Sequence, residues 1–423
     1  MAVDHMSGDI FRQRSLAPDP AAPIPAVFVR SPTWHPFLYR KRLDRVEKAR
    51  PGDLVAVYGP NDRVLGYGLY NPRSEIAVRM VFYGEELPDD AAWQKKLDEA
   101  VELRHGLLRI NDVTDAYRVI HAEADGLSGL VVDRLGDVLS AETFTLGMYQ
   151  RAEAILARLA AALGTKFTVV RPSPQFLSQE GSEPPGFASA DLPPEVTVRE
   201  YGTRFRVRFV GGHKTGFFCD QRENRKRLAE FCEGRTVLDL CCYTGGFAVQ
   251  AKCLGKAAEV TGVDLDEEPL KLARENANLN QARVRFVQDD AFAYMREMLR
   301  LERRYDVVVL DPPKLVRSRA DLEEGTRKHF DLNRLAMRLV KPGGLMLSCC
   351  CSGLLKEAEF VQLLRQSAYQ GGELIAAATA DSSEKHAARP MQILARSGAA
   401  ADHPVSAAVP ETEYLKAVWM RLG

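Results

Sequence analysis

One cysteine of this chain combines a nucleophilic side chain with a position at the end of an apolar run. Residues 344–351 read GLMLSCCC, and a Ser-Gly pair follows at once. Packing explains Cys349 and Cys350 in such a run, because buried cysteine behaves as a small apolar residue. Cys351 is the last of the three, where the end of a strand points into a cleft, and a thiolate there is a nucleophile. We therefore predict that Cys351 reacts covalently with a substrate.

A second candidate for chemistry is an aspartate followed by two prolines, Asp311-Pro312-Pro313-Lys314, at the end of the apolar run 306–311. Consecutive prolines cannot continue an interior strand, so the chain must turn rigidly there. In nucleic-acid and protein amino-methyltransferases, a D/N-P-P-x turn at this place holds a planar substrate nitrogen. By that analogy Asp311 faces a target base, with Pro312, Pro313 and Lys314 beside it. The alternative is a stiff loop exit without a ligand.

Together, Asp311 and Cys351 indicate chemistry on a pyrimidine ring. Carbon 5 of cytosine is too electron-poor to attack a methyl sulfonium unless a nucleophile first adds at carbon 6. We expect Cys351 to form that bond while Asp311, carrying or sharing a proton, hydrogen-bonds ring nitrogen 3 and stabilises the enamine. Methyl transfer, loss of the carbon 5 proton and elimination of the thiol would then give 5-methylcytosine. The sequence does not identify the group that removes the carbon 5 proton.

The cofactor is indicated by a glycine-rich turn and by carboxylates after successive apolar runs. Gly245 and Gly246 lie in LDLCCYTGGF (238–247) and permit close backbone approach at the start of a helix. Because the turn lacks G-x-G-x-x-G, it does not predict a dinucleotide. The sulfonium and amino acid group of S-adenosylmethionine favour acidic partners instead. We expect Asp239 and Asp220 near the amino acid group, Asp264 at the ribose and Asp290 at the adenine, with a helix cap as the alternative for the last two.

These residues lie in a regular alternation of strand and helix that begins at residue 222. The expected strands are 236–240, 259–265, 284–288, 306–311 and 344–351, with segments of helical length and period between them. This pattern predicts an α/β fold with a Rossmann-like, doubly wound and mostly parallel sheet. In such sheets ligands bind at the carboxyl ends of the strands.

The N-terminal part is expected to bind RNA. Short apolar runs at 53–59, 64–71 and 75–84 indicate a small β domain. The chain has a net charge of 0, but residues 28–80 hold ten lysines and arginines against five acidic residues. Such clusters neutralise phosphates without reading bases, and a solvated strand domain is the alternative. The candidate contacts are Arg40, Lys41 and Arg42, with Lys214, Arg222 and Arg225 in a basic segment that extends toward the cleft.

Composition and the positions of prolines and glycines suggest that the chain has four segments. The protein is expected to be cytoplasmic. The Pro- and Ala-rich start makes 1–25 a flexible tail, followed by the small β domain (26–88), a central α/β domain (89–200) and the Rossmann-like domain (201–423). No window approaches the roughly 18 to 20 apolar residues of a membrane helix. The eight cysteines lie between Cys219 and Cys351 without a C-x-x-C, which suits neither disulfides nor a metal site.

The chain resembles the bacterial large-subunit rRNA 5-cytosine methyltransferases that carry an N-terminal PUA domain. The likeness spans residues 28–423 and is carried by HAEADGLSGLVVDRLGD (121–137), GHKTGFFCDQRENR (212–225), YTGGF (243–247), VVLDPPK (308–314), CSGL (351–354), ADHPV and YLKA. It implies a PUA module, a central domain and a class I S-adenosylmethionine-dependent methyltransferase, with Cys351 matching the catalytic cysteine. It also implies that the cofactor and base sites are lined by Asp239, Tyr243, Gly245, Asp264, Asp290 and Asp311. The chain departs from the family in its longer N-terminal tail, in Cys219 and in the two cysteines beside Cys351.

Two other functions stay open. An RNA guanine N-methyltransferase would use Asp311 and the prolines without Cys351, and a non-catalytic RNA-binding or ribosome-assembly factor would keep the fold alone. The expected partner is rRNA of the large subunit (23S), with its target base unpaired or flipped out. A homodimer is one assembly that the sequence permits, and neither a metal nor a membrane is expected.

Overall fold

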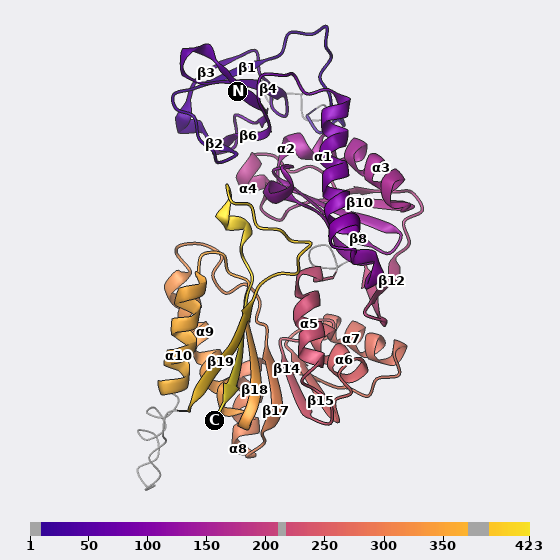
Figure 1. Cartoon of the computed structure of the whole chain (residues 1–423), viewed down its shortest axis with the longest axis vertical. Helices are drawn as coiled ribbons and strands as arrows, with labels where there is room; N and C mark the ends of the chain where they lie inside the picture. Colours follow the sequence, from indigo (N-terminus) through magenta and orange to yellow (C-terminus); the bar gives the residue numbers. More distant parts are fainter. Residues whose placement is uncertain (1–9, 210–216, 371–388) are drawn as a thin grey trace, which may run out of the picture. The chain divides into compact units, whose positions relative to one another are not determined.

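The computed structural model describes residues 10–209, 217–370 and 389–423. The chain divides into two compact units, which are described separately (Figure 1). The N-terminal unit comprises the chain up to Val198, Val207–Asp220 and Ala401–Thr412. The C-terminal unit comprises Arg199–Arg206, Gln221–Ala400 and Glu413–Gly423.

The first sheet of the N-terminal unit has six strands in the order β2-β6-β5-β4-β1-β3. β1 and β4 are parallel, and the other neighbours are antiparallel. The short apolar runs bury Val27, Val55, Val57 and Val78 in one core, and the turn residues between the runs reverse the chain. The strands are β1 (Ala26–Val29), β2 (Phe37–Tyr39), β3 (Leu43–Glu47), β4 (Leu54–Tyr58), β5 (Val64–Tyr70) and β6 (Ile76–Tyr83).

The second sheet of this unit has five strands in the order β11-β10-β9-β8-β7. The apolar faces of two helices pack on it and bury Trp93, Leu97, Ile155 and Leu159 in a shared core. The strands are β7 (Ala116–His121), β8 (Leu130–Leu135), β9 (Val138–Thr143), β10 (Phe167–Pro172) and β11 (Phe187–Ala188). The helices are α1 (Asp90–Glu102), α2 (Leu146–Tyr149), α3 (Ala152–Leu163) and α4 (Phe176–Glu180).

Residues 10–18 pack against the N-terminal unit, which corrects the expectation of a flexible tail there, whereas residues 19–23 are exposed. Leu16 is buried in the core of α1 and α3. Arg14 pairs with Asp53 at 2.6 Å, and its backbone N–H donates to the carbonyl oxygen of Gln150. The sequence concealed these contacts because each joins residues that are far apart along the chain. Residues 1–9 lie outside the described residues.

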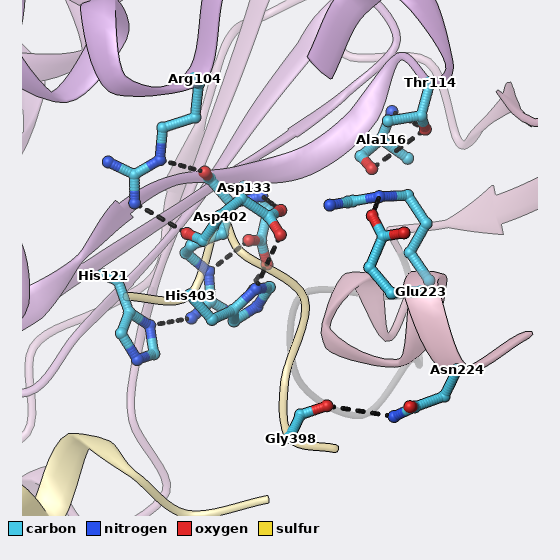
Figure 2. Close-up of polar contacts among 12 residues, drawn as sticks. Arg104, Thr114, Ala116, His121, Asp133, Glu223, Asn224, Gly398, Asp402 and His403 are labelled. Atoms are coloured by element: carbon cyan, nitrogen blue, oxygen red, sulfur yellow. Dashed lines mark hydrogen bonds and ion pairs between the residues drawn. The ribbon is translucent and has the colours of Figure 1, made fainter. Parts of the chain in front are cut away.

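The segment Ala401–Thr412 belongs to the N-terminal unit, although the expected Rossmann-like domain ran without interruption to residue 423. Figure 2 shows its attachment, in which the buried Arg104 guanidinium donates to the carbonyl oxygen of Asp402 at 2.7 Å. The Asp402 carboxylate accepts from the backbone N–H of Arg118 at 2.8 Å. Next to it, the rings of His403 and His121 meet edge to face with centroids 5.2 Å apart. Buried polar contacts therefore hold Ala401–Thr412 on the N-terminal unit.

The C-terminal unit is built on seven strands in the order β16-β15-β14-β17-β18-β20-β19. The first five are parallel, as the sequence predicts, whereas β20 and β19 run antiparallel at one edge. The strands are β14 (Thr236–Leu240), β15 (Glu259–Asp264), β16 (Arg285–Gln288), β17 (Tyr305–Leu310), β18 (Val340–Cys350), β19 (Met391–Ser397) and β20 (Lys416–Leu422). A separate hairpin pairs β12 (Glu195–Glu200) with β13 (Thr203–Arg208).

Helices cover both faces of this sheet and create two cores. Because successive side chains of a strand point to opposite faces, Met346 of β18 packs in the core of α9 and α10, while Leu347 packs in the core of α5 and α6. The helices are α5 (Arg222–Ala229), α6 (Gly246–Cys253), α7 (Glu267–Leu279), α8 (Ala291–Arg300), α9 (Leu322–Arg338) and α10 (Glu357–Gln370). In the described ranges, no helix has the length and apolarity to cross a membrane.

Candidate active site

Five residues singled out by the sequence lie at the carboxyl ends of five neighbouring parallel strands. Asp239 is the penultimate residue of β14 and Asp264 the last of β15, while Asp290 follows β16 closely. Asp311 and Cys351 come directly after β17 and β18. β14 and β17 are neighbours although β15 and β16 intervene in the chain, so the strand order reverses between them. Open α/β sheets bind their ligands at this point.

Asp239 is a buried carboxylate whose charge is only partly compensated. It is 0 % exposed. Its Oδ2 accepts the backbone N–H of Ala248 at 2.9 Å, and its Oδ1 has no hydrogen-bond partner in the part of the chain that the structure describes. Burial, followed by the neighbouring charge of Asp311, raises the pKa of this carboxyl well above its usual value. A cation at Oδ1 would favour the ionised form, so the residue fits the ammonium group of S-adenosylmethionine.

The loop between β14 and α6 is held in an uncommon backbone conformation. Cys241 and Tyr243 have φ angles of 62° and 51°, in the left-handed region that favours glycine. Gly245, with a φ of 80°, precedes α6 where an added Cβ would lie 3.0 Å from the ring of Phe286. The backbone N–H of Tyr243 donates to Asp264 Oδ2 at 2.8 Å and ties the loop to β15. Such backbone strain clusters at ligand sites.

Cys241 is a residue of this site that sequence reasoning missed. Burial, followed by four surrounding carboxylates, raises the pKa of its thiol; these are Asp264, Asp311, Asp239 and Asp290. The four expected acidic residues therefore gather around one point. The only signal in the sequence was the position of Cys241 beside Cys242 in the glycine-rich turn, which does not distinguish a ligand site from packing.

Asp264 and Asp290 both accept hydrogen bonds from backbone N–H groups, but only Asp290 is a helix cap, because the N-cap of α7 is Asp266. Asp264 Oδ1 accepts the backbone N–H of Asp266 at 3.1 Å. Asp290 is the N-cap of α8, and its Oδ1 accepts the N–H of Ala293 at 3.0 Å. Carboxylate oxygens accept more than one hydrogen bond, so these contacts orient the two side chains and leave acceptor capacity for ribose and adenine groups.

Cys351 lies against the turn that Asp311 opens. Its Sγ is 4.0 Å from the carbonyl oxygen of Pro312. The backbone N–H of Val316 donates to Ser352 Oγ at 3.2 Å, so the turn and the end of β18 are joined. Pro312 is buried, whereas Pro313 and Lys314 are exposed beside it. The structure thus brings together the expected nucleophile and the expected base-facing carboxyl group.

Most of the other cysteines are buried and have raised pKa values. Cys349 and Cys350 are 0 % exposed, in agreement with the packing interpretation. Burial is the first cause of the raised thiol pKa values of Cys349, Cys350, Cys232, Cys242 and Cys253. Because only thiolates are good nucleophiles, these residues are poorly suited to covalent catalysis.

The expected basic track lies only partly on the surface. Arg40 and Lys41 are exposed and Arg42 is half-buried, in a single 3-10 turn after β2. In contrast, Arg222 is 1 % exposed, and its guanidinium pairs with Glu223 at 3.3 Å. We therefore correct the expectation that Arg222 offers a charge to RNA, because a buried guanidinium is occupied by its protein partners.

Arg225 is also buried and paired within the protein, so the expectation that it contacts RNA is corrected as well. It is 3 % exposed, and its Nε and Nη2 donate to the two carboxylate oxygens of Glu200 at 2.7 and 2.5 Å. Asp220 lies in the 3-10 turn Cys219–Gln221 and belongs to the N-terminal unit, and Lys214 lies outside the described residues. Arg222 and Arg225 therefore form buried pairs within the protein, where the sequence predicted contacts to RNA.

A hollow elsewhere on the C-terminal unit is not part of this site. It is lined by Thr236, Glu259, Arg285 and Tyr305, which begin β14, β15, β16 and β17, so it lies at the opposite edge of the sheet. Within the described ranges, no group of three or more His, Cys, Asp or Glu side chains could hold a metal ion.

Comparisons with known proteins agree with this geometry. A family model described as S-adenosylmethionine-dependent methyltransferase matches residues 187–369, and one described as PUA-like domain matches residues 33–82. The ribosomal RNA large subunit methyltransferase I of Photobacterium profundum is 34 % identical over 390 residues, which cover 90 % of this chain and 94 % of that protein. The protein of the same name from Aeromonas hydrophila is 35 % identical over 395 residues, with 92 % and 95 % covered.

The chain belongs to the ribosomal RNA large subunit methyltransferase I family. As a member of that family, it is an S-adenosylmethionine-dependent methyltransferase with a PUA-like domain, which confirms the resemblance seen in the sequence. A methyltransferase from Streptococcus mutans aligns with a TM-score of 0.74 at 18 % identity, over 93 % of this chain and all (100 %) of its own. A methyltransferase in complex with S-adenosylhomocysteine aligns with a TM-score of 0.73 at 19 % identity, over 92 % and 95 %. These likenesses confirm the expected α/β fold.

Proposed function

We propose that this protein methylates carbon 5 of a cytosine in large-subunit ribosomal RNA through a covalent bond to Cys351. The names of its relatives support ribosomal RNA of the large subunit as substrate. The observation that carries the proposal is the contact of Cys351 Sγ with the Asp311 turn, 4.0 Å from the Pro312 carbonyl, at the edge that holds the carboxylate cluster. A methyltransferase acting on an amine needs the turn but has no use for a thiol beside it.

The carboxylate cluster supports a specific orientation of S-adenosylmethionine, which when bound supplies an electrophilic methyl group on its sulfonium. In our proposal Asp239 pairs with the ammonium group and Asp264 accepts from the ribose hydroxyls. Asp290 accepts from the adenine amine. The strained loop with Tyr243 and Gly245 lies against the cofactor, and Asp220 is a further candidate for the amino acid end.

The affinity for S-adenosylmethionine is expected to increase with pH. Without a cation, the pKa of the Asp239 carboxyl is raised well above its usual value, so at low pH this group is neutral and cannot pair with the ammonium group. The carboxylate forms as the pH rises from the usual carboxyl range through the raised pKa, and the Kd falls over that window. Replacement of Asp239 with Asn should raise the Kd roughly 100-fold near neutral pH and remove this dependence.

Calorimetric titration between about pH 4.5 and 7 measures this effect. Asp331→Asn is a matched control, because Asp331 is a partly exposed residue of α9 whose carboxylate pairs with Arg334 at 3.2 Å. An Asp239→Asn variant that keeps the wild-type pH dependence would exclude Asp239 as the ammonium partner.

The reaction on the base follows from the two groups at the rim. The Cys351 thiolate adds to carbon 6, and the electron pair of the carbon 5–carbon 6 double bond moves toward nitrogen 3, where Asp311 donates a hydrogen bond or its proton. Carbon 5 is then nucleophilic and would take the methyl group, whose bond to sulfur would break and leave S-adenosylhomocysteine, while the proton on nitrogen 3 would return to Asp311. Loss of the carbon 5 proton returns its electron pair to the ring, and the carbon 6–sulfur bond breaks to release the thiolate.

The PUA-like part is proposed to hold the RNA through phosphates, with residues 26–88 as the binding domain, 89–200 as the central domain and 201–423 as the catalytic domain. The 3-10 turn of Arg40, Lys41 and Arg42 is the best candidate surface. Pro313 and Lys314 are exposed at the catalytic rim and are proposed to contact the nucleotide there.

Replacement of Arg40, Lys41 and Arg42 together with alanine should weaken RNA binding at every sequence. Three lost phosphate contacts would reduce the slope of log affinity against log salt concentration by about 2 to 3. Binding of an rRNA fragment is measured over a salt series. The control removes three other exposed charges of the N-terminal unit, Lys95, Arg109 and Lys166. An equal change of the slope in both variants would show a general effect of charge and would exclude the Arg40–Arg42 turn as a specific RNA-binding surface.

Nucleoside mass spectrometry tests the proposed product. Ribosomal RNA from a strain without the gene is incubated with the purified protein and S-adenosylmethionine, and then digested. We expect one new 5-methylcytosine, which oligonucleotide mapping places in 23S rRNA. A methylated guanine would instead support the N-methyltransferase, and failure to bind the cofactor would support an assembly factor. A cytoplasmic location follows from this substrate as part of the proposal.

A further inference from the structure

A chain of hydrogen-bonded side chains connects the last two strands of the C-terminal unit to Asp311. The Trp419 indole N–H donates to Ser397 Oγ at 2.8 Å. The Ser397 hydroxyl donates to Asn224 Oδ1 at 2.7 Å, and Asn224 Nδ2 donates to Gln221 Oε1 at 2.7 Å. Finally, Gln221 Nε2 donates to Asp311 Oδ2 at 3.0 Å. This series of hydrogen bonds joins β20, the end of β19, the start of α5 and the turn after β17.

The direction of every hydrogen bond in this series is fixed by two groups whose roles cannot change, a donor and an acceptor. An indole N–H can only donate, so Ser397 Oγ accepts from Trp419 and its own proton points to Asn224 Oδ1. The other hydrogen of Asn224 Nδ2 goes to the carbonyl oxygen of Gly398 at 3.1 Å. A backbone carbonyl can only accept, so the Asn224 amide cannot be reversed. Gln221 must therefore present its carbonyl oxygen to Asn224 and its NH₂ group to Asp311.

Gln221 is not held in this position by a structural task at the helix end. It is the N-cap residue of α5, but its side chain makes no capping hydrogen bond. Gln221 and Asn224 are 4 % and 2 % exposed, and burying two amides is costly unless their hydrogen bonds are satisfied. The amides are satisfied by each other, by Ser397 and Gly398, by the Cys349 thiol and by Asp311. The arrangement therefore fixes one oxygen of the Asp311 carboxyl group.

From this geometry we propose that Gln221 is a positioning residue that keeps Asp311 Oδ2 an acceptor and places any proton of Asp311 on Oδ1. This inference rests on the proposed function, in which Asp311 presents a proton to nitrogen 3 of cytosine. A carboxyl group can carry its proton on either oxygen, and a rotamer that offers the wrong one cannot donate to the base. The amide donor removes that freedom, so the proton that the proposed reaction needs is carried by Oδ1.

Replacement of Gln221 with Glu tests this role with little change in shape. The new carboxyl group faces Asp311 Oδ2 across 3.0 Å, and two carboxylates this close keep one proton between them to a higher pH. When this proton lies on the introduced group and Asp311 carries its own proton on Oδ1, the introduced group donates to Oδ2 as the amide did. When both protons are lost, repulsion displaces Asp311. The kcat of the variant should therefore be within about tenfold of wild type near pH 6 and about 100-fold lower near pH 8.5.

Within the described residues, the titratable groups that interact with Asp311 include Asp239, Cys241, Cys349 and Cys350. Gln221 also hydrogen-bonds the Cys349 thiol, so the change in pH profile is assigned to the new pair only if it persists when Cys349 is replaced with alanine. Gln362→Glu is the matched control, because Gln362 is an exposed residue of α10 and the change in charge is identical. A second variant, Ser397→Ala, removes the donor to Asn224 Oδ1 and should lower kcat several-fold without the shift in pH profile.

Single-turnover rates with saturating S-adenosylmethionine, together with its Kd and the melting temperature, decide the outcome. An unchanged pH profile in Gln221→Glu would overturn the proposal. An equal loss of activity at all pH values, accompanied by weaker cofactor binding or a lower melting temperature, would also overturn it and show a structural role. Failure of the proposed function is detected separately, because the wild-type protein itself would then form no 5-methylcytosine.

Discussion

Replacement of Cys351 with alanine is expected to abolish methyl transfer while the Kd for S-adenosylmethionine stays unchanged. Without the thiolate, carbon 6 has no covalent partner and carbon 5 stays too electron-poor to react, so kcat should fall at least about 10⁴-fold. Cofactor binding should survive because the carboxylate cluster belongs to other strand ends. Both quantities come from single-turnover assays with rRNA and from calorimetric titration.

Cys350→Ala is the matched control for this variant. Cys350 is the neighbouring thiol, and it is completely buried in the core of α9 and α10. Its loss should cost stability through a small cavity but spare the chemical step. RNA containing 5-fluorocytosine should form a lasting adduct with wild type and with Cys350→Ala, but not with Cys351→Ala. Substantial methylation by Cys351→Ala would rule out the cysteine mechanism.

Asp311→Asn is expected to have the second largest effect. An amide fills the same space and retains a group that can hydrogen-bond, but it cannot transfer a proton to nitrogen 3. General acid catalysis typically contributes 10²- to 10⁴-fold, so we expect kcat to fall roughly 10³-fold with little change in KM for RNA. The variant also changes the turn to Asn-Pro-Pro-Lys, which is the alternative form of the amino-methyltransferase motif.

This substitution therefore separates the two enzymatic functions. A guanine N-methyltransferase would tolerate Asn at position 311, because its turn only needs to hold an amine. Retention of most of the activity in Asp311→Asn, with an unaltered methylated nucleoside, would contradict proton donation by Asp311. Asp331→Asn again serves as the control, because it makes the same chemical change on a residue of α9.

The sequence predicted those parts of the site that depend on the spacing of apolar runs along the chain. In a parallel sheet each strand must end at the same edge, so carboxylates after successive apolar runs were bound to meet, and Asp239, Asp264 and Asp311 do surround Cys241. The same reasoning placed Cys351 beside the proline turn. Strand period and spacing were sufficient because helices connect the successive strands from β14 to β18, so these strands all run in the same direction.

The parts that it missed depend on partners far away in the sequence. Arg222 and Arg225 look like surface charges, and only the fold reveals that Glu200 occupies one of them in a buried pair. Leu16 looked like part of a tail because its core lies on α1 and α3. The link from Gln221 to Ser397 spans 176 positions (397 minus 221) and leaves no periodic signal. Such contacts are tertiary, and no propensity encodes them.

The burial of the thiols has a practical consequence for chemical labelling. Six of the eight cysteines have raised pKa values, and Cys219 is also buried. Alkylating reagents consume the thiolate form of accessible residues, so most of these groups should be silent toward iodoacetamide in the native protein. Cys351 is partly exposed, so iodoacetamide should alkylate it in the natural sequence and abolish methyl transfer, without prior removal of the other cysteines.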